Sequence, residues 1–505
     1  MNNDDRPSLP RCATGIKGLD HILRGGIPSG QTHLVHGGPG AGKTTLGLQF
    51  LMDGRDRGER VLYATLLQTR EELESAVHGH GWDLDGIDLM EMPPAMVDDH
   101  SSDQTLFVTA EVELNEAAEA IVKAIERHRP QRMVLDSISE LAVLVDSNYP
   151  LRRQLLRIKR SLARYGCTGI FIAGEGREED LESTKTMLTG VIHLRQTTPE
   201  FGPPHRSLRV SKMRGMVYAG GWHDFRIVGG GIVVFPRLEI PRNAPRSKPP
   251  EIISCGVAEI DAMLGGGMEE GTSCLVAGST GAGKSTFASL YVQAVAARGE
   301  RAVVFCFDER REMFLRRSDG LGMDISRLVA QGKVDLRQVD LGELTSGEFL
   351  QSIRRAVDED GVRVVVIDSL TGYFASMPHE EHLTTQLHEL LGYTGQAGAL
   401  SFLVMSSHSL NAPYLEMLVD PSYLADTVVM VRLFESRGRI HRCIAVMKKR
   451  TGRHEESIRE FRLGAGGIRV GAPLVNFSGV LGGTPRYEGP PADLMDNHEA
   501  CADDA

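Results

Sequence analysis

The stretch Gly37-Gly38-Pro39-Gly40-Ala41-Gly42-Lys43-Thr44-Thr45 decides the fold of this chain. It has the G-x-x-x-x-G-K-[ST] spacing of a phosphate-binding loop. The apolar run 32–36 precedes it and the helix-like run 46–51 follows it, which is the strand, loop and helix context that such a loop needs. A glycine-rich turn without a ligand is the alternative interpretation. The lysine and threonine at their expected positions favour phosphate binding.

The chemistry of phosphate binding explains these residue types. Glycines let backbone N–H groups turn onto phosphate oxygens, and the start of the following helix adds partial positive charge. Lys43 is expected to neutralise the β- and γ-phosphates, and the Thr44 hydroxyl is expected to hold Mg²⁺. The predicted nucleotide-binding residues of this loop are Gly38, Gly40, Ala41, Gly42, Lys43, Thr44 and Thr45.

A second phosphate loop lies 241 positions further along, at residues 278–286. The same offset places Gly15 on Gly256, Asp20 on Asp261, and the run 58–60 on the run 299–301. Many matches in one register indicate a duplicated domain. The predicted nucleotide-binding residues of the second loop are Ser279, Thr280, Gly281, Ala282, Gly283, Lys284, Ser285 and Thr286.

Each copy is predicted to have an α/β fold of the P-loop type. Continuous apolar runs at 133–136, 169–173, 364–368 and 401–405 alternate with helix-like segments, which predicts a mainly parallel sheet covered on both faces. The domains are expected to span 13–236 and 251–483, with a flexible N-terminus at 1–12. A proline-rich linker at 237–250 and a disordered acidic tail at 484–505 complete the division.

Composition limits the classes of function. Apolar residues make up 41% of the 505 residues, and the net charge is −11, which argues against general adhesion to nucleic acid or anionic lipid. The seven cysteines form no C-x-x-C pair, which is typical of a reducing compartment. The start of the chain lacks the pattern of a signal peptide, and no apolar run reaches membrane-spanning length, so we expect a cytoplasmic location.

Two aspartates are predicted to orient Mg²⁺. Asp136 and Asp368 each end an apolar strand and are each followed by serine. A single aspartate at a strand end is more often a turn or cap residue. A phosphate loop upstream in both copies favours the metal role, with Thr44 and Asp136 as one pair and Ser285 and Asp368 as the other.

Hydrolysis also needs a group that orients or deprotonates water. In the second copy the strand at 302–307 ends in Asp308-Glu309, which fits this role, with Lys284 as the catalytic cation. The matching positions of the first copy are Leu67-Gln68, which have no suitable carboxylate. Glu71, Glu72 or Glu175 could replace them, but solvated helix or loop charges are the favoured interpretation of these three residues.

Two basic segments also correspond, at 211–215 and 447–451. Lys and Arg two positions apart point to one face of a strand. The residues concerned are Lys212 and Arg214 in the first copy and Lys448 and Arg450 in the second. A solvated edge strand is one interpretation. The other is a pair of basic fingers that reach the γ-phosphate of a nucleotide bound by a neighbouring subunit.

These features together resemble the KaiC family of tandem RecA-type ATPases, over residues 14–487. The resemblance rests on the doubled phosphate loops, the G-[IV]-x-x-[LI]-D motif at 15–20 and 256–261, and the run 81–84. In the second half it rests on the run 425–429, the K-x-R segment 448–450, His454 and the run 458–461. The combination is more specific than a single phosphate loop.

The resemblance implies two RecA-like domains in a homohexameric double ring, with ATP and Mg²⁺ at the subunit interfaces. It also implies ATP hydrolysis and autophosphorylation of a residue pair in the second domain. The acidic pair of the family falls on Asp308 and Glu309, and in the first domain on Leu67-Gln68. The phosphoacceptor pair falls on Ser422 and Tyr423, where tyrosine stands in place of threonine.

Three hypotheses follow from the sequence. The first is a signalling ATPase that turns ATP over mainly in the second domain and phosphorylates Ser422. The second is a scaffold in which ATP holds the rings together and regulatory protein partners bind. The third is a DNA motor, for which the fold is the only argument. The net charge and the lack of a basic stripe with interleaved aromatic residues argue against the third hypothesis.

Overall fold

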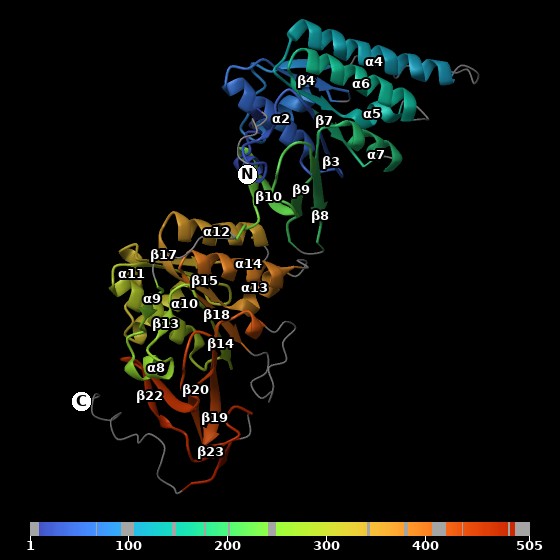
Figure 1. Cartoon of the computed structure of the whole chain (residues 1–505). Helices are drawn as coiled ribbons and strands as arrows, with labels where there is room; N and C mark the ends of the chain where they lie inside the picture. Colours follow the sequence, from blue (N-terminus) through green and yellow to red (C-terminus); the bar gives the residue numbers. More distant parts are fainter. Residues whose placement is uncertain are drawn as a thin grey trace, which may run out of the picture. The chain divides into compact units, whose positions relative to one another are not determined.

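The structure is a computed structural model, which describes most of the chain as two compact units, Met1–Arg237 and Leu238–Ala505. Figure 1 shows the elements of each unit. The described residues are 10–66, 68–91, 106–143, 148–175, 178–199, 202–240, 249–340, 344–377, 382–406, 421–436, 438–482 and 485–489. Within them, no helix is both long enough and apolar enough to cross a membrane.

The described part of the first unit contains a nine-stranded sheet in the order β11-β10-β9-β8-β3-β7-β6-β4-β5. The strands from β8 to β5 are parallel, and β9, β10 and β11 follow as antiparallel neighbours. The strands are β3 (Thr32–Gly37), β4 (Val61–Thr65), β5 (Asp88–Glu91), β6 (Arg132–Asp136), β7 (Thr168–Ala173), β8 (Gly190–Thr197), β9 (His205–Met213), β10 (His223–Val228) and β11 (Gly231–Phe235). The helices are α1 (Lys17–Ile22), α2 (Lys43–Asp56), α3 (Arg70–His78), α4 (Leu106–His128), α5 (Ile138–Val143), α6 (Asn148–Arg164) and α7 (Glu178–Met187).

The second unit repeats this sheet, in the order β16-β15-β17-β18-β14-β19-β20-β21-β22. The strands are β14 (Ser273–Gly278), β15 (Arg301–Cys306), β16 (Val334–Gln338), β17 (Val362–Asp368), β18 (Leu400–Ser406), β19 (Thr427–Ser436), β20 (Arg439–Lys449), β21 (Arg459–Gly464) and β22 (Gly467–Pro473). The helices are α8 (Ala258–Met263), α9 (Lys284–Ala297), α10 (Arg311–Gly320), α11 (Ile325–Ala330), α12 (Ser346–Asp358), α13 (Leu370–Ser376), α14 (Leu383–Gln396) and the 3-10 turn η2 (Pro421–Tyr423). The predicted α/β fold with tandem RecA-like domains is confirmed.

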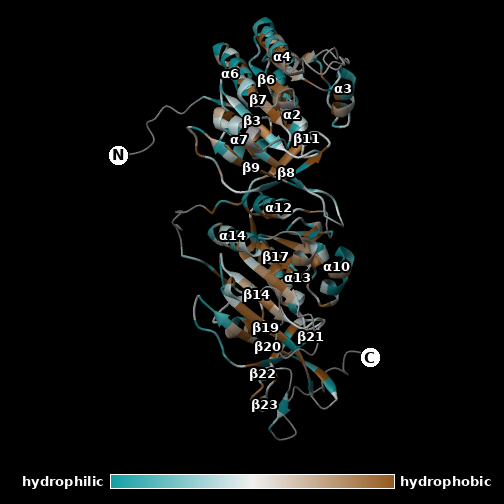
Figure 2. Cartoon of the chain, turned by 90° about the vertical axis from the view of Figure 1, so that its right-hand side faces the viewer, coloured by the Kyte–Doolittle hydropathy of each residue, from teal (hydrophilic) through white to brown (hydrophobic). Residues whose placement is uncertain are grey.

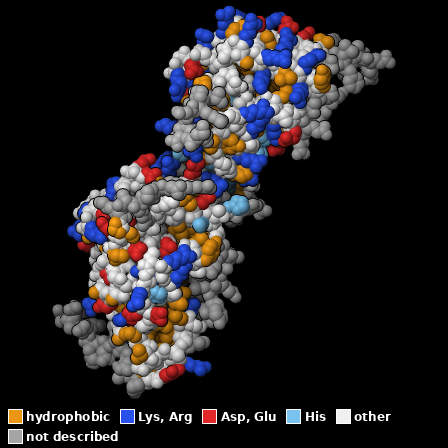
Figure 3. Space-filling view, viewed as in Figure 1, with side chains coloured by type: hydrophobic (Ala, Val, Ile, Leu, Met, Phe, Trp, Pro, Cys, Tyr) orange, Lys and Arg blue, Asp and Glu red, His pale blue; other side chains and the backbone are white. Residues whose placement is uncertain are grey.

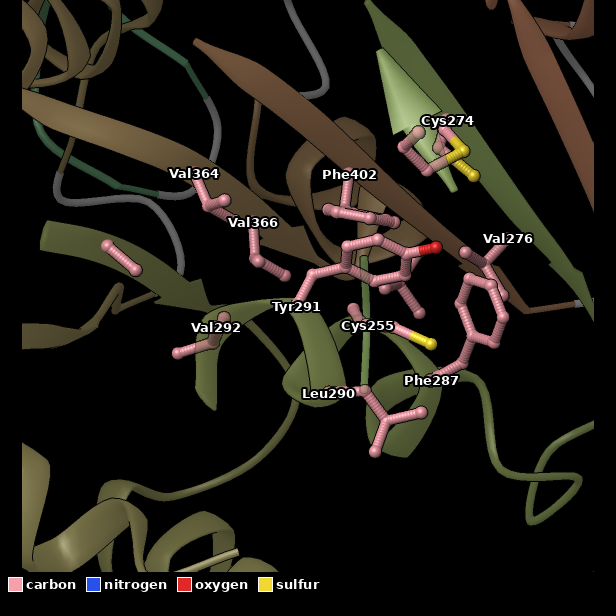
Figure 4. Packing of buried hydrophobic residues seen from close by; sticks show 14 of the residues in the cluster. Cys255, Cys274, Val276, Phe287, Leu290, Tyr291, Val292, Val364, Val366 and Phe402 are labelled. Atoms are coloured by element: carbon pink, nitrogen blue, oxygen red, sulfur yellow. The ribbon is translucent and has the colours of Figure 1, made fainter. Parts of the chain in front are cut away.

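Helices cover both faces of each sheet. Alternate residues of the central strands therefore pack in different cores. In β6, Val134 packs in the core that contains the α2 residues, whereas Met133 and Leu135 pack in the core that contains residues of α4 and α6. Figure 2 shows the resulting hydrophobic strands between helices with hydrophilic outer surfaces. In the second unit, Figure 4 shows Tyr291 of α9 against Phe402 of β18 in the corresponding core, with ring centroids 4.8 Å apart.

The G-[IV]-x-x-[LI]-D motif stabilises the start of each unit. The Asp20 carboxylate accepts hydrogen bonds from the Thr14 N–H and hydroxyl, both at 2.8 Å. Asp261 accepts equivalent bonds from the Cys255 N–H at 3.0 Å and the Ser254 hydroxyl at 2.5 Å. The motif therefore ties a loop to the first helix. Short sheets of β1 (Arg11–Cys12) with β2 (Ile27–Pro28), and of β12 (Ile252–Ile253) with β13 (Met268–Glu269), lie at these starts.

One buried charge distinguishes the two cores. Arg132 on β6 is 2% exposed and pairs with Glu59 at 2.5 Å and Asp53 at 3.0 Å. Its Nη1 also donates to the backbone carbonyls of Ala13 and Phe50, at 3.0 and 2.9 Å. The pairing register places Val364 at the equivalent position of the second unit. The first unit therefore uses an ion network where the second uses an aliphatic contact.

Two segments that we predicted to be unstructured contain ordered residues. Leu238, inside the predicted linker, is buried in a core of the second unit. Near the other end, β23 (Phe477–Ser478) pairs with β24 (Arg486–Tyr487), so ordered chain extends past the predicted start of the tail at 484. Residues 241–248 and 490–505 lie outside the described residues.

Candidate nucleotide sites in the two units

The first phosphate loop joins β3 to α2. Gly42 is the N-cap of α2 and has a φ of 91°, which is the left-handed region that favours glycine. A Cβ atom at this position would lie 2.8 Å from Cδ1 of Ile227. Both the backbone conformation and the close packing therefore require glycine directly before Lys43.

The Lys43 side chain lies under this loop. Its Nζ donates hydrogen bonds to the carbonyl oxygens of Gly37 and Gly38, both at 2.8 Å. Burial lowers the pKa of Lys43, while the carboxylates of Asp136 and Glu175 oppose that shift. The two carbonyl dipoles balance only part of the Lys43 charge, and a bound phosphate would balance the rest.

The predicted metal pair of the first unit is brought together. The Thr44 hydroxyl donates to Oδ2 of Asp136 at 2.7 Å, and the Tyr63 hydroxyl donates to the same oxygen at 2.7 Å. Hydroxyl and carboxylate oxygens beside a phosphate loop are ligands that suit Mg²⁺. Thr44 of the loop helix and Asp136 of β6 therefore fit as residues that would hold Mg²⁺.

The second phosphate loop has the same frame. Lys284 is 6% exposed and donates to the Ser279 carbonyl at 2.8 Å. Burial lowers its pKa to about 8, against the opposing effect of Asp368 and Asp308. Burial raises the pKa of Asp368, and a hydrogen bond with Ser285 acts against that rise. The second predicted metal pair is therefore also in contact.

The two acidic residues after β15 lie beside this loop but have different partners. Arg317 on α10 holds Glu309 with two hydrogen bonds, Nη2 to Oε2 at 2.8 Å and Nε to Oε1 at 3.2 Å. Its Nη1 also donates to the Thr286 hydroxyl at 3.4 Å, which ties the ion pair to the loop helix α9. Asp308 accepts a hydrogen bond from the Ser369 hydroxyl. The carboxylates are thus fixed beside the predicted phosphate position.

The first unit lacks both members of this ion pair. Gln68 stands at the position of Glu309, and the offset of 241 places Ala76 at the position of Arg317. Gln68 hydrogen bonds through its backbone to the Thr65 hydroxyl at 2.9 Å. Leu67 lies outside the described residues.

Of the three glutamates considered as replacements, one lies at the loop. Glu72 accepts a hydrogen bond from the Thr69 N–H at 3.0 Å and caps α3, and Glu71 is exposed in the first turn of that helix. Glu175 follows β7, and its Oε1 would lie 3.1 Å from a Cβ atom on Gly38. Of the three glutamates, Glu175 is therefore the one whose side chain faces the first phosphate loop.

The basic segments lie at the ends of β9 and β20, beyond the residues that pair with β10 and β21. Each segment therefore has a paired strand on one side only, β8 in the first unit and β19 in the second. Lys212 pairs with Val191 at the start of β8, and Lys448 pairs with Val428 at the start of β19. Because β8 and β19 run parallel to the strands that end in the phosphate loops, both lysines lie at the opposite end of the sheet from their own loop.

Backbone carbonyls hold these basic side chains in the same way in both units. Lys212 Nζ donates to the carbonyls of Lys185 and Leu188, at 2.6 and 2.8 Å. Lys448 Nζ donates to the carbonyls of Ser422 and Ala425, at 2.9 and 2.7 Å. Arg214 donates to the Thr186 carbonyl at 2.9 Å, and Arg450 donates to the Tyr423 carbonyl at 2.7 Å.

The two phosphoacceptor candidates therefore adjoin the basic segment of the second unit. They lie in η2, just before β19. The Ser422 side chain is partly exposed, and Tyr423 is 58% exposed. Both lie at the sheet end opposite the phosphate loop of their own unit.

An arginine pair at the phosphate loops was missed by the sequence analysis. Arg206 Nε lies 3.3 Å from the Gly40 carbonyl, and Arg442 Nε lies 3.4 Å from the Gly281 carbonyl. The offset between them is the same as that between Lys212 and Lys448. The alignment that matches Lys212 with Lys448 also matches Arg206 with Arg442, so extending it by a few residues could have found this pair.

Comparison with known proteins agrees with the duplicated site. A family model described as the KaiC ATPase matches residues 12–239 and 253–475. The circadian clock oscillator protein KaiC of Synechococcus elongatus is 28% identical over 96% of this chain and 93% of its own length. The circadian clock protein KaiC3 of Synechocystis sp. is 27% identical over 96% of this chain and 97% of its own length. Because the family match covers both units and their phosphate loops, the chain belongs to the KaiC family of ATPases.

Proposed function

We propose that this protein is a hexameric signalling ATPase that binds ATP and Mg²⁺ in both units and hydrolyses ATP mainly in the second. The observation that carries the proposal is the ion pair between Glu309 and Arg317 beside Lys284, set against Gln68 and Ala76 in the first unit. Glu309 positions or deprotonates the attacking water, while Lys284 neutralises charge on the phosphates. Ser285 and Asp368 would hold Mg²⁺, which would supply further positive charge there.

The first unit then binds ATP chiefly as a structural ligand. Its lysine, threonine and aspartate form the same frame as in the second unit, so the binding groups are complete. The Tyr63 hydroxyl further fixes Asp136. Nucleotide bound here stabilises the ring, which is also the basis of the alternative function, a scaffold for regulatory protein partners in which turnover is incidental.

The position of the basic segments supports an assembly of several copies. Lys212, Arg214, Lys448 and Arg450 lie at the far end of the sheet from their own loop, so we propose that they act on the nucleotide of a neighbouring copy. There they neutralise the γ-phosphate, as cations supplied by a neighbouring protein do in other phosphoryl-transfer sites. Ser422, next to Lys448, can then attack the γ-phosphorus of the same nucleotide and release ADP.

Substitution of Glu309 tests the ATPase assignment. We expect Glu309→Gln to lower steady-state ATP hydrolysis at least about a hundredfold, because a general base is lost. Glu312→Gln, an exposed glutamate three residues along, is the matched control and should keep parental activity. A Glu309→Gln protein that hydrolyses ATP as fast as the parent would refute the assignment.

Mixing two inactive variants tests the shared site. Lys284→Ala removes the loop cation, and Lys448→Ala with Arg450→Ala removes the basic segment. If the segment acts on a neighbour, mixed assemblies contain some sites with both parts intact, so mixing restores part of the activity. No recovery in assemblies proven to be mixed would contradict sharing.

Two measurements separate the autokinase from the scaffold. Mass spectrometry after incubation with ATP should find phosphate on Ser422, and Ser422→Ala should remove that signal. Light scattering should show smaller particles when ATP is removed. A hexamer that persists unchanged without nucleotide would exclude ATP as a structural ligand, whatever the state of Ser422.

A further inference from the structure

Each unit holds a turn of chain against its basic segment, and the carbonyl contacts align the two turns. The lysine of the segment bonds to the Ser422 carbonyl in the second unit, at 2.9 Å, and to the Lys185 carbonyl in the first, at 2.6 Å. The arginine bonds to the Tyr423 carbonyl in the second unit, at 2.7 Å, and to the Thr186 carbonyl in the first, at 2.9 Å. Thr186 therefore occupies the position of Tyr423, one of the two phosphoacceptor candidates.

Thr186 presents an accessible hydroxyl at this position. It lies in the last turn of α7 and is exposed, whereas Thr184 and Met187 on either side are buried. Its hydroxyl donates to the Ser183 carbonyl at 2.7 Å, so the lone pairs of the oxygen remain available to attack an electrophile. The first unit thus has an aliphatic hydroxyl where the second has a phenol.

Three cations lie at this end of α7 without a carboxylate partner among the described residues. Lys159 of α6 bonds to the Met187 carbonyl at 2.6 Å, next to the contacts that Lys212 and Arg214 make. Burial lowers the pKa of Lys212, and the charges of Arg214 and Lys159 lower it further. Figure 3 shows that Lys and Arg predominate over Asp and Glu on the displayed face of this unit. A phosphate at a helix C-terminus is ordinarily unfavourable, but these cations would offset that effect.

A nucleotide that modifies Thr186 must belong to another copy of the chain. The Thr189 N–H bonds to the Thr32 carbonyl at 2.9 Å, so the end of α7 adjoins the start of β3, whereas the phosphate loop follows the end of that strand. Strand β3 has six residues, and at about 3.3 Å per residue its two ends lie roughly 17 Å apart. That separation is too large for direct transfer from the loop of the same unit.

We propose that Thr186 is a further phosphoacceptor, which takes the γ-phosphate of ATP bound at the first phosphate loop of a neighbouring copy. This inference rests on the proposed function, in which Lys212 and Arg214 act on that nucleotide. The Thr186 hydroxyl oxygen forms a bond to the γ-phosphorus, the bond from this phosphorus to the oxygen of the β-phosphate breaks, and ADP leaves. The hydroxyl proton passes to Glu175 of the neighbouring copy, which faces that loop.

This transfer does not need the groups that the first unit lacks. Hydrolysis requires a residue that holds a mobile water, whereas the threonine oxygen is fixed covalently to the chain and placed by its backbone. The groups that bind ATP, Lys43, Thr44 and Asp136, form the same frame as in the second unit. The first site can therefore modify Thr186 while hydrolysing little ATP.

Site-resolved mass spectrometry after incubation with ATP tests the assignment of the residue. We expect phosphate on Thr186 in the parent protein and loss of that signal in Thr186→Ala. Thr186→Ser keeps a hydroxyl and should retain phosphate at position 186. Ser183→Ala, one turn earlier on the same helix, is the matched control and should keep the Thr186 signal.

Variants of the two loops identify the donor nucleotide. In assembled protein, Lys43→Ala should remove phosphate from Thr186 and leave it on Ser422, whereas Lys284→Ala should do the reverse. Glu175→Gln, which keeps the loop cation, should also remove the Thr186 signal. Isotopically labelled Lys43→Ala chains are then mixed with unlabelled Thr186→Ala chains. Transfer between copies predicts phosphate on Thr186 of the labelled chains, and its absence from assemblies proven to be mixed would refute that step.

The outcomes separate this inference from the proposed function. Phosphate on Ser422 with none on Thr186 would overturn the inference and leave the proposed function intact. Phosphate on Thr186 with none on Ser422 would support the inference and contradict the proposed autokinase residue, and phosphate on neither would overturn both. A Thr186 signal that persists in Lys43→Ala and disappears in Lys284→Ala would assign the donor to the second site, which would also overturn the inference.

Discussion

The two nucleotide sites share one backbone frame but differ in the groups that can act on water. Both have the buried lysine under the loop and the hydroxyl and carboxylate pair for Mg²⁺. The second adds Glu309 and Arg317, and the first has Gln68 and Ala76 at those positions. The acid and its arginine partner are therefore present together or absent together. Under the proposed function, this difference teaches that the groups for nucleotide binding can be kept while those that act on water are lost.

The first test compares equivalent core positions of the two units. We expect Arg132→Ala to destabilise the first unit by about 3–5 kcal/mol, because it leaves the Glu59 and Asp53 carboxylates without their buried partner. Val364→Ala at the equivalent position of the second unit should cost about 1–3 kcal/mol. Chemical denaturation monitored separately for each unit by hydrogen exchange measures both changes. Equal effects would show that the ion network is no more important than the aliphatic contact.

The loop lysines provide the second test. Lys284→Ala should reduce ATP hydrolysis at least about a hundredfold, whereas Lys43→Ala should keep most of the hydrolysis per assembled chain and lower nucleotide-dependent assembly. Hydrolysis and particle mass should be measured on the same samples. If Lys43→Ala abolishes ATP hydrolysis by fully assembled protein, the proposal that the first site binds ATP and the second hydrolyses it does not hold.

A third test transfers the missing groups into the first unit. In a Lys284→Ala background, Gln68→Glu with Ala76→Arg should raise the residual hydrolysis about tenfold, because it rebuilds a held carboxylate beside Lys43. Gln68→Glu alone should give less, since the carboxylate then lacks its arginine. In the same background Glu175→Gln reports whether Glu175 supplies the residual activity; no change would exclude it.

The smallest expected effect is a proton uptake on binding. In the free second site the pKa of Lys284 is about 8, and a bound triphosphate should raise it toward the ordinary lysine value. Between these two pKa values binding takes up a proton, so affinity falls as pH rises, by less than about tenfold per pH unit. Calorimetry of Lys43→Ala protein at about pH 8.5, in two buffers of different ionisation enthalpy, measures the uptake. Identical heats in both buffers would contradict it.

The sequence predicted the frame of the sites because loops and strands are local features. The apolar runs at 133–136 and 364–368 became central strands, and their terminal aspartates lie beside the loops as expected. The ordered pairing of β24 was missed, because two residues carry too little pattern to signal a strand.

Contacts between distant segments were not predictable in the same way. Arg317 reaches Glu309 from α10, and Arg206 reaches the first loop from β9, and neither belongs to a motif. The placement of the basic segments at the sheet end opposite their own loop depended on the antiparallel pairing of β9 with β8 and of β20 with β19, which follows from tertiary structure. The cavity between α4 and α6, lined by Asn115, Arg153, Gln154, Arg157 and Arg160, became visible only when the helices were placed together.

The placement of loop and basic segment at opposite ends of one sheet also determines how activity should depend on assembly. If the basic segments act on a neighbouring copy, as proposed, two different surfaces meet at each contact, so the interface would be heterologous and an isologous dimer could not satisfy it. A single chain would then contain no complete site, an open pair would contain one site of each unit type, and a closed ring would contain one site of each unit type for every chain. The rate per chain should therefore rise with protein concentration and level off once the rings close.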